Sequence, residues 1–519
     1  MVSGDRIRRD IAIPAFGAFF VALVLESRTL LPDVAFWDTA EFQAIGPILG
    51  IAHPTGYPSY TLLAWLASVV LQPFGNEALR ANLLSALLVS STCALTATVI
   101  VQLTRRRLIA LAAGVALALT PTVWRIGLRA DAHALHILLV ALLLVLLVAW
   151  ADRHRGGEAG AGRWLVASAI VFGVALGNHA LTLLLAPGIA VFVLLVDPWI
   201  VVRRLRLVLA CAAALVLTTV AIYAYLPIRS AMDPPLDYAN PETWEAFRYI
   251  VLGEQFRGTF SPLPSLSEGA GIVWDQLWTN LGPVAVASLA GLAVGAVRWP
   301  RVTALGGLWF VLTFVFALGY LNADIERYYL VPLLLAVIWA ALATAAAVEG
   351  LGWLLRRIAR RNRPEGGAEP ARRFTSAAAV VAAVLLVTPS ALALPETFAE
   401  VDASRETEAR TWLDATFVAL EPDAVIVSWW SFSTPMWYGR FVEGRRPDIT
   451  IIDDRTILDE DLGDVFAVIE RYLGQRPVYI LRLSHDLEPV AERYELELVD
   501  GIPGIGQVWR VLPDAVAGS

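Results

Sequence analysis

Residues 36–60 read FWDTAEFQAIGPILGIAHPTGYPSY, and the interpretation of the whole chain starts from this stretch. It follows the first apolar segment but is itself too polar to face lipid. Asp38 and Glu41 are three residues apart, so a helix here would place both carboxylates on one face. His53 follows in a turn rich in proline and glycine. Because such groups are costly beside a membrane, the pattern predicts a functional site; the alternative is an acidic helix start followed by an ordinary loop.

The composition is that of a protein that crosses a membrane many times. Of the 519 residues, 57% are hydrophobic and only 17% are charged, and the mean hydropathy is +0.62. These values exclude a soluble enzyme. Cys93 and Cys211 lie inside apolar segments, so no disulfide framework is expected. The first apolar segment lacks a small-residue cleavage site and is predicted to be a retained helix.

Eleven apolar segments are long enough to cross a bilayer, which requires about 20 residues. A twelfth, shorter candidate covers residues 59–73. The eleven predicted spans are 11–31, 82–103, 108–124, 133–151, 164–181, 182–199, 207–227, 280–297, 302–321, 328–350 and 374–394.

The distribution of arginine distinguishes eleven spans from twelve. If residues 59–73 do not cross, 21 of the arginines before residue 396 lie inside and eight lie outside. If they do cross, the N-terminal arginine cluster lies on the opposite side of the membrane from all the other arginine clusters. The positive-inside rule therefore favours eleven spans and a surface or re-entrant helix at 59–73. It predicts a multi-pass protein of the cell membrane, with a cytoplasmic N-terminus and an extracytoplasmic C-terminal domain.

The last part of the chain has a different charge from the rest. From Glu396 to the end there are 24 acidic residues and 11 arginines, a net charge of −13, whereas the remainder has 23 and 29, a net charge of +6. An acidic end on a basic membrane part argues against a nucleic-acid partner. We therefore predict a membrane domain over 1–395 and a soluble domain over 396–519.

The soluble domain is predicted to be a small α/β unit. It has no glycine-rich phosphate fingerprint and no metal-ligand spacing, so support or acceptor recognition is its expected role. Its Trp429, Trp430 and Trp437 are more typical of a core than of a ligand platform. Strands are predicted at 423–430, 448–453 and 477–483, helices at 434–443 and 461–473, and edge strands at 491–499 and 507–512.

The predicted topology gathers the unusual polar residues on the outer face. They come from a first outer loop at 32–81, a long outer loop at 228–279 and three shorter loops, while the inner face has no comparable set of acids and histidines. Beyond the first loop these residues are Arg125, Arg129, Asp131, His133, His136, Asn178, His179, Arg229, Asp324, Glu326 and Arg327.

Three motifs resemble those of a known family. DTAEF (38–42) followed by GIAHPTGYPSY (50–60) is similar to its Asp-Ser-Gly-Glu and Ala-His-Pro-Pro-Gly-Tyr-Pro signatures. YLPIRSAMDPPLDYANPETWEAF (225–247) and NADIERYYLVP (322–332) resemble two further signatures. The family comprises membrane proteins formerly of unknown function in the glycosyltransferase C superfamily. It includes a eukaryotic protein O-mannosyltransferase that modifies plexin-type ectodomains. Thr39-Ala40 and Thr55 depart from the family pattern, but neither change removes an acid.

The resemblance implies a mostly α, polytopic glycosyltransferase C fold and a polyprenyl-phosphate sugar donor. The sugar would be mannose, another hexose or a pentose, and the acceptor a protein, lipid or glycan outside the cytoplasm. It implies that Asp38 is the catalytic acid, with Glu41 as its companion. One positioned carboxylate suits a general base, direct displacement inverts the anomeric centre, and the leaving phosphate needs cations. The predicted substrate-binding residues are His53, Tyr57, Arg129, Asp131, His179, Arg229 and Arg327.

Two further questions remain open from the residues. Asp38, Glu41 and Asp131 are hard oxygen ligands that suit a divalent cation, but the resemblance implies transfer without an essential metal. A transporter or flippase of a lipid-linked or small polar substrate is the main alternative to an enzyme. It would usually show broken polar helices in two repeated halves, and no internal repeat is evident. A structural assembly protein is the third alternative, in which the carboxylate pair would have no role.

Overall fold

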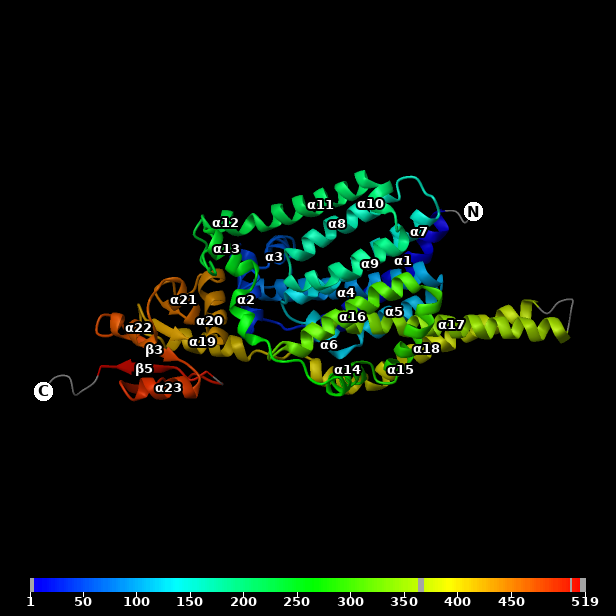
Figure 1. The fold of residues 1–519 in the computed structure, drawn as a ribbon. Helices are drawn as coiled ribbons and strands as arrows, with labels where there is room; N and C mark the ends of the chain where they lie inside the picture. The colour runs from blue at the N-terminus through cyan, green and yellow to red at the C-terminus, as the bar shows by residue number, and fades with distance from the viewer. Residues whose placement is uncertain (1–3, 363–367, 505, 514–519) are drawn as a thin grey trace.

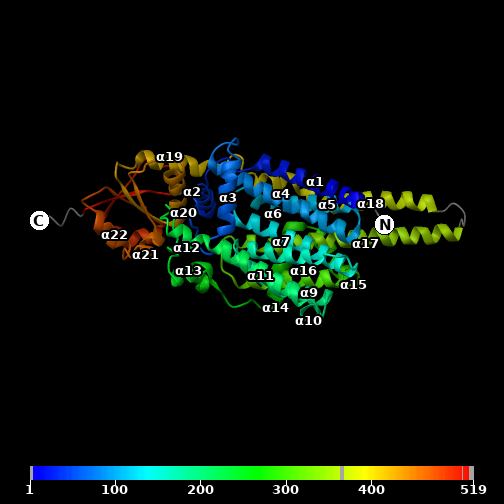
Figure 2. The ribbon, with the colours of Figure 1, turned by 90° about the horizontal axis from the view of Figure 1, so that it is seen from above.

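The chain folds into a bundle of apolar helices with an α/β unit at one end, as the computed structural model shows (Figure 1). The structure describes residues 4–362, 368–504 and 506–513. Here the membrane bundle denotes α1 to α18, and the C-terminal unit denotes α19 to β5. The predicted domains, 1–395 and 396–519, also include residues 1–3, 363–367, 505 and 514–519, which lie outside the described residues. The view from above shows the same arrangement (Figure 2).

Within the described residues, seven helices are long and apolar enough to cross a membrane, or nine if two bent helix pairs are each one span. The bent pairs are α5 (Arg107–Ala118) with α6 (Pro121–Gly127), at 72°, and α14 (Leu266–Leu281) with α15 (Val284–Arg298), at 114°. The seven contain α1 (Gly4–Thr29), α4 (Glu77–Thr104), α7 (Ala132–Arg155), α11 (Leu205–Tyr223) with α12 (Tyr225–Ser230), α16 (Pro300–Gly319), α17 (Leu330–Asn362) and α18 (Ala368–Val401).

Every predicted span coincides with helix. The two not yet accounted for coincide with α8 (Gly162–Leu176) and with η1 (Ala180–Leu185) followed by α9 (Ala186–Val196). These helices are shorter than the seven. The protein is thus a multi-pass membrane protein, while the number of helices that cross stays a prediction.

Burial separates the centre of the bundle from its rim. The apolar segment of α7 is 89% buried, whereas that of α11 has no buried residue. A helix that is apolar all round suits either a protein core or a lipid-facing surface, and the two helices occupy these two environments. Close packing at the centre requires small residues. At Gly291 of α15, an added Cβ would lie 1.7 Å from the Trp339 carbonyl oxygen of α17.

Two short helices follow α1 at the end of the bundle that faces the C-terminal unit (Figure 1). They are α2 (Trp37–Ile48) and α3 (Pro58–Val70). The 13 residues of α3 are fewer than the about 20 that a spanning helix needs. This length agrees with the prediction that residues 59–73 do not cross. Proline at the first position of α3 suits a helix start, because its missing N–H would have no partner there.

The predicted long outer loop, 228–279, contains short helices rather than irregular chain alone. These are α13 (Trp244–Val251) and η2 (Glu254–Thr259), and most of α14 also lies within the predicted loop. Ile51, just after α2, donates its backbone N–H to Leu236 O at 2.8 Å. The loop is thereby held against the end of α2.

The C-terminal unit is a five-stranded sheet in the order β2-β1-β3-β5-β4. Strands β2, β1 and β3 are parallel, and β5 and β4 add antiparallel at one edge. The two central strands are wholly buried, as expected when helices cover both faces. The elements are α19 (Glu408–Ala419), β1 (Val425–Ser428), α20 (Trp430–Trp437), η4 (Tyr438–Val442), β2 (Thr450–Ile452), α21 (Asp454–Asp459), α22 (Val465–Tyr472), β3 (Val478–Leu481), α23 (Ser484–Ala491), β4 (Glu495–Leu498) and β5 (Trp509–Leu512).

The C-terminal unit packs directly onto α2. Ala40 and Ala44 of α2 share one apolar cluster with residues of α19, α20 and the central strands. Arg410 pairs with Asp33 at 2.7 Å, just before α2. The Tyr438 hydroxyl accepts the backbone N–H of Ala78 at 3.1 Å. The helix that carries the carboxylate pair is therefore enclosed between the two parts of the protein.

Candidate active site

A cavity of about 810 Å³ lies between the end of the bundle and the C-terminal unit. Its lining combines residues that are far apart in the sequence, from α2 through η2 and η3 (Ile325–Tyr329) to α20 and α21. Six of the predicted site residues or their near neighbours line it: Asp38, His53, Tyr57, His133, His179 and Arg327.

Asp38 lies in the first turn of α2 and faces this cavity. Trp37, at the start of the helix, has a φ of 60°, which is unusual for a bulky residue. Its ring packs edge-on against Trp429 of the C-terminal unit, with the centroids 5.1 Å apart. The Asp38 side chain keeps 30% of its surface exposed, so a substrate in the cavity can reach it.

Two donors fix the Asp38 carboxylate. Arg327 Nη1 lies 3.3 Å from Oδ2, and the indole Nε1–H of Trp430 donates to Oδ1 at 3.3 Å. Burial tends to raise the pKa of Asp38, but the positive charges of His53 and Arg327 outweigh it, so the pKa lies below its ordinary value. The carboxylate is therefore ionised at neutral pH.

Arg327 lies in η3 (Ile325–Tyr329) and is shared by three carboxylates. Besides Asp38, it contacts Asp131 Oδ2 at 3.5 Å and pairs with Asp324 through Nη2. The side chain of Arg327 is only 15% exposed, whereas that of Asp324 is 60% exposed. Asp324 is the partner that a ligand displaces most readily, because exposed ion pairs contribute little.

Glu41 has a different environment from Asp38, although both are on α2. Its side chain is 2% exposed and pairs with His53 Nδ1, and its other oxygen accepts the His53 backbone N–H at 2.8 Å. Glu41 is absent from the lining of the cavity. Burial opposes the charge on His53, but the Glu41 and Asp38 carboxylates raise the pKa of His53 to about 9. Protonated His53 therefore bridges the two acids electrostatically.

Three histidines lie close together at this site, of which His133 and His179 line the cavity and His136 is buried behind them. Asp131 caps α7 by accepting the backbone N–H of His133 at 2.7 Å, and it also contacts His133 Nδ1 at 2.9 Å. The rings of His133 and His179 lie 4.7 Å apart, and those of His136 and His179 lie 6.0 Å apart. His133 Nε2 is buried and has no hydrogen-bond partner within the described part of the chain. It is available to a polar group of a ligand.

His179 is a neutral hydrogen-bond donor. Its Nδ1 accepts the backbone N–H of Leu181 at 3.2 Å, so the proton is on Nε2. Burial, together with the neighbouring His133 and His136, lowers the pKa of His179 below its ordinary value. Tyr57 packs edge-on against His179, and its hydroxyl lies 3.3 Å from His53 Nε2.

The structure does not bring Arg129 and Arg229 into the cavity lining. Arg229 donates from Nε to the Leu49 carbonyl at 2.7 Å and from Nη2 to the Ile48 carbonyl at 3.1 Å. It thus satisfies carbonyl groups left free at the end of α2. Arg129 pairs with Glu406 at 3.2 Å. These contacts account for Arg229 without a ligand, whereas the Nε of Arg129 is buried and has no hydrogen-bond partner among the described residues. Because neither arginine lines the cavity, the phosphate-binding role predicted for them gains no support from the geometry.

The sequence interpretation missed several lining residues, above all Trp430, Arg257, Tyr328 and Arg455. A signal for Trp430 and Arg455 was present. Trp430 follows β1 and Asp454 follows β2, and the carboxyl ends of neighbouring parallel strands meet at the same edge of a sheet. Assigning all three tryptophans to a core overlooked that edge.

The oxygen ligands proposed for a cation are engaged elsewhere. Asp38 and Asp131 contact Arg327, and Glu41 pairs with His53. Among the described residues, no three or more His, Cys, Asp or Glu side chains are arranged to hold a metal ion. Transfer without an essential metal stays a prediction.

Comparison with known proteins places this site in a family context. The model of the protein O-mannosyl-transferase TMEM260 N-terminal domain matches residues 38–199. The matched stretch begins at Asp38 and ends after His179. The resemblance to this family is confirmed. The mouse protein O-mannosyl-transferase TMEM260 is 28% identical over 231 residues, which cover 43% of this chain and 31% of the mouse protein. The match thus spans about a third of the length of that relative.

Solved structures show the fold of the whole chain. ArnT from Cupriavidus metallidurans bound to undecaprenyl phosphate aligns over 100% of both chains, with a TM-score of 0.53 and 17% identity. Its apo form gives a TM-score of 0.57 and 15% identity, covering 95% of this chain and 96% of that one. The apo Archaeoglobus fulgidus oligosaccharyltransferase gives 0.54 and 13%, covering 95% and 73%. The chain thus shares the fold of these ArnT and oligosaccharyltransferase structures, a helical membrane fold of the glycosyltransferase C type with a small C-terminal sheet.

Proposed function

We propose that this protein is a membrane glycosyltransferase. It moves a sugar, mannose or another hexose, from a polyprenyl-phosphate donor to an extracytoplasmic acceptor hydroxyl, with inversion. The observation that carries the proposal is the partly exposed Asp38 carboxylate, held by Arg327 and Trp430 in a cavity of about 810 Å³. That volume is within the range of small-molecule sites. The site lies at an end of the bundle, which supports a transferase over a transporter with a midplane site.

Asp38 is the general base in this reaction. The acceptor hydroxyl transfers its proton to Asp38 as the acceptor oxygen forms a bond to the anomeric carbon. At the same time the bond from that carbon to the phosphate oxygen breaks, and polyprenyl phosphate leaves with the electron pair. The lowered pKa of Asp38 keeps the carboxylate ready to accept a proton at neutral pH. Glu41 is less suited to the role because it is buried and paired with His53.

The leaving phosphate is stabilised by Arg327 and His179. Both line the cavity, and His179 offers an N–H from a neutral ring. A phosphate oxygen takes the place of the exposed Asp324 carboxylate on the Arg327 guanidinium. Arg257, 63% exposed and also in the lining, adds a cation at the rim. Together they stabilise charge that develops as the sugar departs.

The donor lipid lies against an apolar wall of the cavity. This wall comes from η1, from η2 and the residue after it, and from the end of α16 and the residue after it. Leu183 is 57% exposed and Phe260 is 51% exposed, although both are apolar. Apolar surface left open at the edge of a membrane bundle suits an isoprenoid chain, which reaches the site from the bilayer. The wall comprises Leu181, Leu183, Leu184, Phe256, Phe260, Phe316 and Tyr320.

The C-terminal unit and the long outer loop form the acceptor side. Arg455 of α21 lies over the rings of Tyr238 and Tyr249, at 4.5 and 5.1 Å from their centroids. Asp459 accepts the backbone N–H of Ala239 at 3.0 Å, which ties the loop to the C-terminal unit. All three side chains, Arg455, Tyr238 and Tyr249, line the cavity. The C-terminal unit thus acts in acceptor recognition as well as in support of the membrane bundle.

The proposal is tested with purified full-length protein and a panel of defined donors. Polyprenyl phosphates that carry mannose, glucose or a pentose are incubated with acceptor peptides, glycans and lipids, and release of polyprenyl phosphate is measured by mass spectrometry. The expected result is acceptor-dependent release from a hexose donor by the wild type. Movement of intact donor across proteoliposome membranes, with no release from any donor, would favour the flippase alternative and contradict the transferase.

A further inference from the structure

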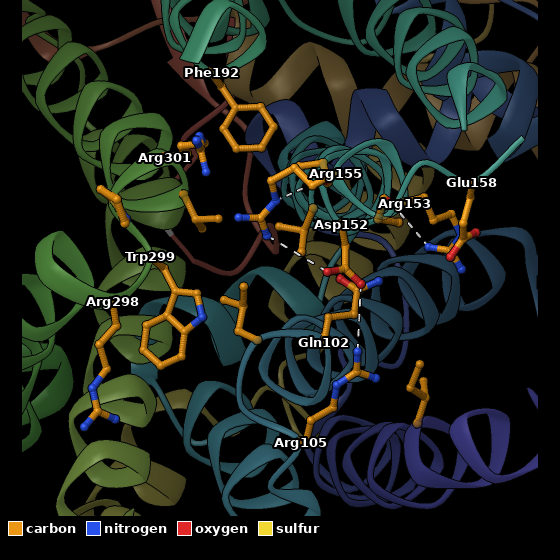
Figure 3. A pocket seen from close by; sticks show the side chains of 17 residues that line it. Gln102, Arg105, Asp152, Arg153, Arg155, Glu158, Phe192, Arg298, Trp299 and Arg301 are labelled. Atoms are coloured by element: carbon orange, nitrogen blue, oxygen red, sulfur yellow. Dashed lines mark hydrogen bonds and ion pairs between the residues drawn. The ribbon is translucent and has the colours of Figure 1, made fainter. Parts of the chain in front are cut away.

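A second cavity, of about 460 Å³, lies at the opposite end of the bundle (Figure 3). The ends of α4 and α7 and the start of α16 surround it, far from the C-terminal unit (Figure 1). None of its lining residues belongs to the candidate active site. Neither the family resemblance nor the proposed reaction gives it a role.

The polar lining of this cavity is strongly basic. Five arginines face two acids, Asp152 and Glu158, so the formal charge of the lining is +3. The arginines come from three separate parts of the bundle. In Figure 3 the guanidinium groups of Arg105 and Arg155 both face Asp152, whereas Arg298 pairs with Glu349 outside the lining. The five arginines are Arg105, Arg153, Arg155, Arg298 and Arg301.

The acids do not occupy the arginines at the centre of the cavity. Asp152 lies 3.8 Å from Arg105 Nη2 and 4.0 Å from Arg155 Nη2, which is too far for a hydrogen bond (Figure 3). Both arginine side chains are more than half exposed, at 56% and 55%. Arg301 uses its Nε for the Leu195 carbonyl, at 2.7 Å. The terminal N–H groups of Arg105 and Arg155 therefore remain available to an anion.

Apart from Gln102, the rest of the lining is apolar. Phe192 and Trp299 lie beside the arginines in Figure 3, and Leu103, Val148 and Val302 add aliphatic surface. A free phosphate ion would need only the cations. A ligand with an anionic head and an apolar body uses both kinds of surface.

We propose that this cavity binds the phosphate headgroup of an anionic membrane phospholipid. The guanidinium groups of Arg105 and Arg155 hold the phosphate oxygens, with Arg301 close by, and the start of each acyl chain lies along Trp299, which is partly exposed. Basic pockets between membrane helices on the cytoplasmic side suit such headgroups. The predicted topology places this end of the bundle in the cytoplasmic leaflet. The inference does not depend on the glycosyltransferase proposal.

The test measures lipid binding to the full-length protein. Native mass spectrometry monitors the bound lipid during titration with phosphatidylglycerol or with phosphatidylcholine. The variant replaces Arg105 and Arg155 with glutamine. The control replaces Arg203 and Arg206 with glutamine, which removes the same charge from exposed residues near the same end but outside the cavity lining. Each arginine near an anionic headgroup contributes about a fivefold gain in affinity, so the double variant should bind phosphatidylglycerol roughly tenfold or more weakly.

We expect wild type and the control variant to prefer phosphatidylglycerol over phosphatidylcholine, and the R105Q/R155Q variant to lose that preference. Equal loss in the control would overturn the assignment to this cavity. If millimolar inorganic phosphate displaces the bound lipid, and the protein prefers neither of the two lipids, the ligand of this cavity is a free anion. That result would overturn the lipid assignment. If the double variant does not purify as a monodisperse protein, R155Q alone should still show a loss of about fivefold, and binding equal to that of the wild type would overturn the proposal.

Discussion

The two ends of the bundle use arginine in opposite ways. At the end facing the C-terminal unit, Arg327 is 15% exposed and contacts three carboxylates. At the other end, Arg105 and Arg155 are more than half exposed, and their only acidic neighbour among the described residues is at 3.8 Å or more. The first arrangement positions the carboxylate that we propose as the general base, whereas the second leaves cations open to a ligand. A count of arginines in a sequence does not distinguish the two.

The largest effect is expected at Asp38. The D38N variant keeps the shape of the side chain but removes the proton acceptor, so turnover should fall by about 10²–10⁴-fold. H53A should lose less, because His53 only sets the charge around the acids. Turnover is compared at matched expression and matched donor affinity. D414N serves as the control, since Asp414 also pairs with an arginine, Arg445 at 2.6 Å, but lies outside the cavity lining.

The E41Q variant tests the end of the bundle where charges are buried and paired, through its effect on the free energy of unfolding. It removes one partner from a buried ion pair, which typically costs about 3–5 kcal/mol of unfolding free energy. Denaturation of the purified variant against wild type measures this cost. If the E41Q variant is inactive but as stable as wild type, the general base is Glu41 and not Asp38.

The Trp430 indole tests whether the C-terminal unit takes part in the site. W430F keeps the ring but loses the N–H that donates to Asp38, and a hydrogen bond to a charged group is worth about 1.5–3 kcal/mol. Turnover should therefore fall roughly tenfold or more. W437F is the matched control in the same helix, with ring packing against Trp430 but no contact to the carboxylate. Equal losses in both variants would mean that packing, not the hydrogen bond, supports Asp38.

A pH dependence of stability is expected from His53. Its pKa is raised from 6.5 to about 9 in the folded protein. The stabilisation that it contributes is full below pH 6.5, decreases between 6.5 and 9, and is lost above 9. The melting temperature of wild type should fall across that window by more than that of H53A. Parallel curves for the two proteins would show that the imidazolium is not part of the folded site.

The smallest effect is expected at the arginine-rich end. D152N removes an acid whose arginine partners lie at 3.8 and 4.0 Å, and exposed pairs contribute at most about 1 kcal/mol. The melting temperature should change little, while binding of phosphatidylglycerol should become tighter. A stability loss as large as that of E41Q would show that the two ends are not built differently.

Much of the fold was predictable because apolar length and strand patterns are local properties. Every predicted span coincides with helix, and the five predicted strands are present, two of them at one edge. For a helix at this position the i,i+3 spacing predicted that Asp38 and Glu41 share one face, and both residues do lie on α2. It did not predict that only Asp38 reaches the cavity, since spacing fixes an angle around the helix and not a depth. That depth depends on His53 and on the docked C-terminal unit.

The rest of the site depends on contacts across long stretches of sequence. Trp430 meets Asp38 across 392 residues, and no local pattern encodes that meeting. Basic residues near a membrane end are equally ambiguous in sequence. Arg229 donates to backbone carbonyl groups, and Arg129 pairs with Glu406. Of these three arginines, only Arg327 contacts Asp38. The arginine clusters after α4 and α7 predicted topology, but their convergence on a cavity is a tertiary property.

Single-turnover transfer from a preloaded donor tests the central claim most directly. Wild type and D38N are loaded with the same polyprenyl-phosphate hexose, donor occupancy is measured, acceptor is added, and polyprenyl phosphate release is followed in time. We predict that wild type and D38N have equal donor occupancy, and that the rate of polyprenyl phosphate release is about 10²–10⁴-fold lower in D38N. Equal occupancy with a rate near that of wild type would contradict Asp38 as the general base.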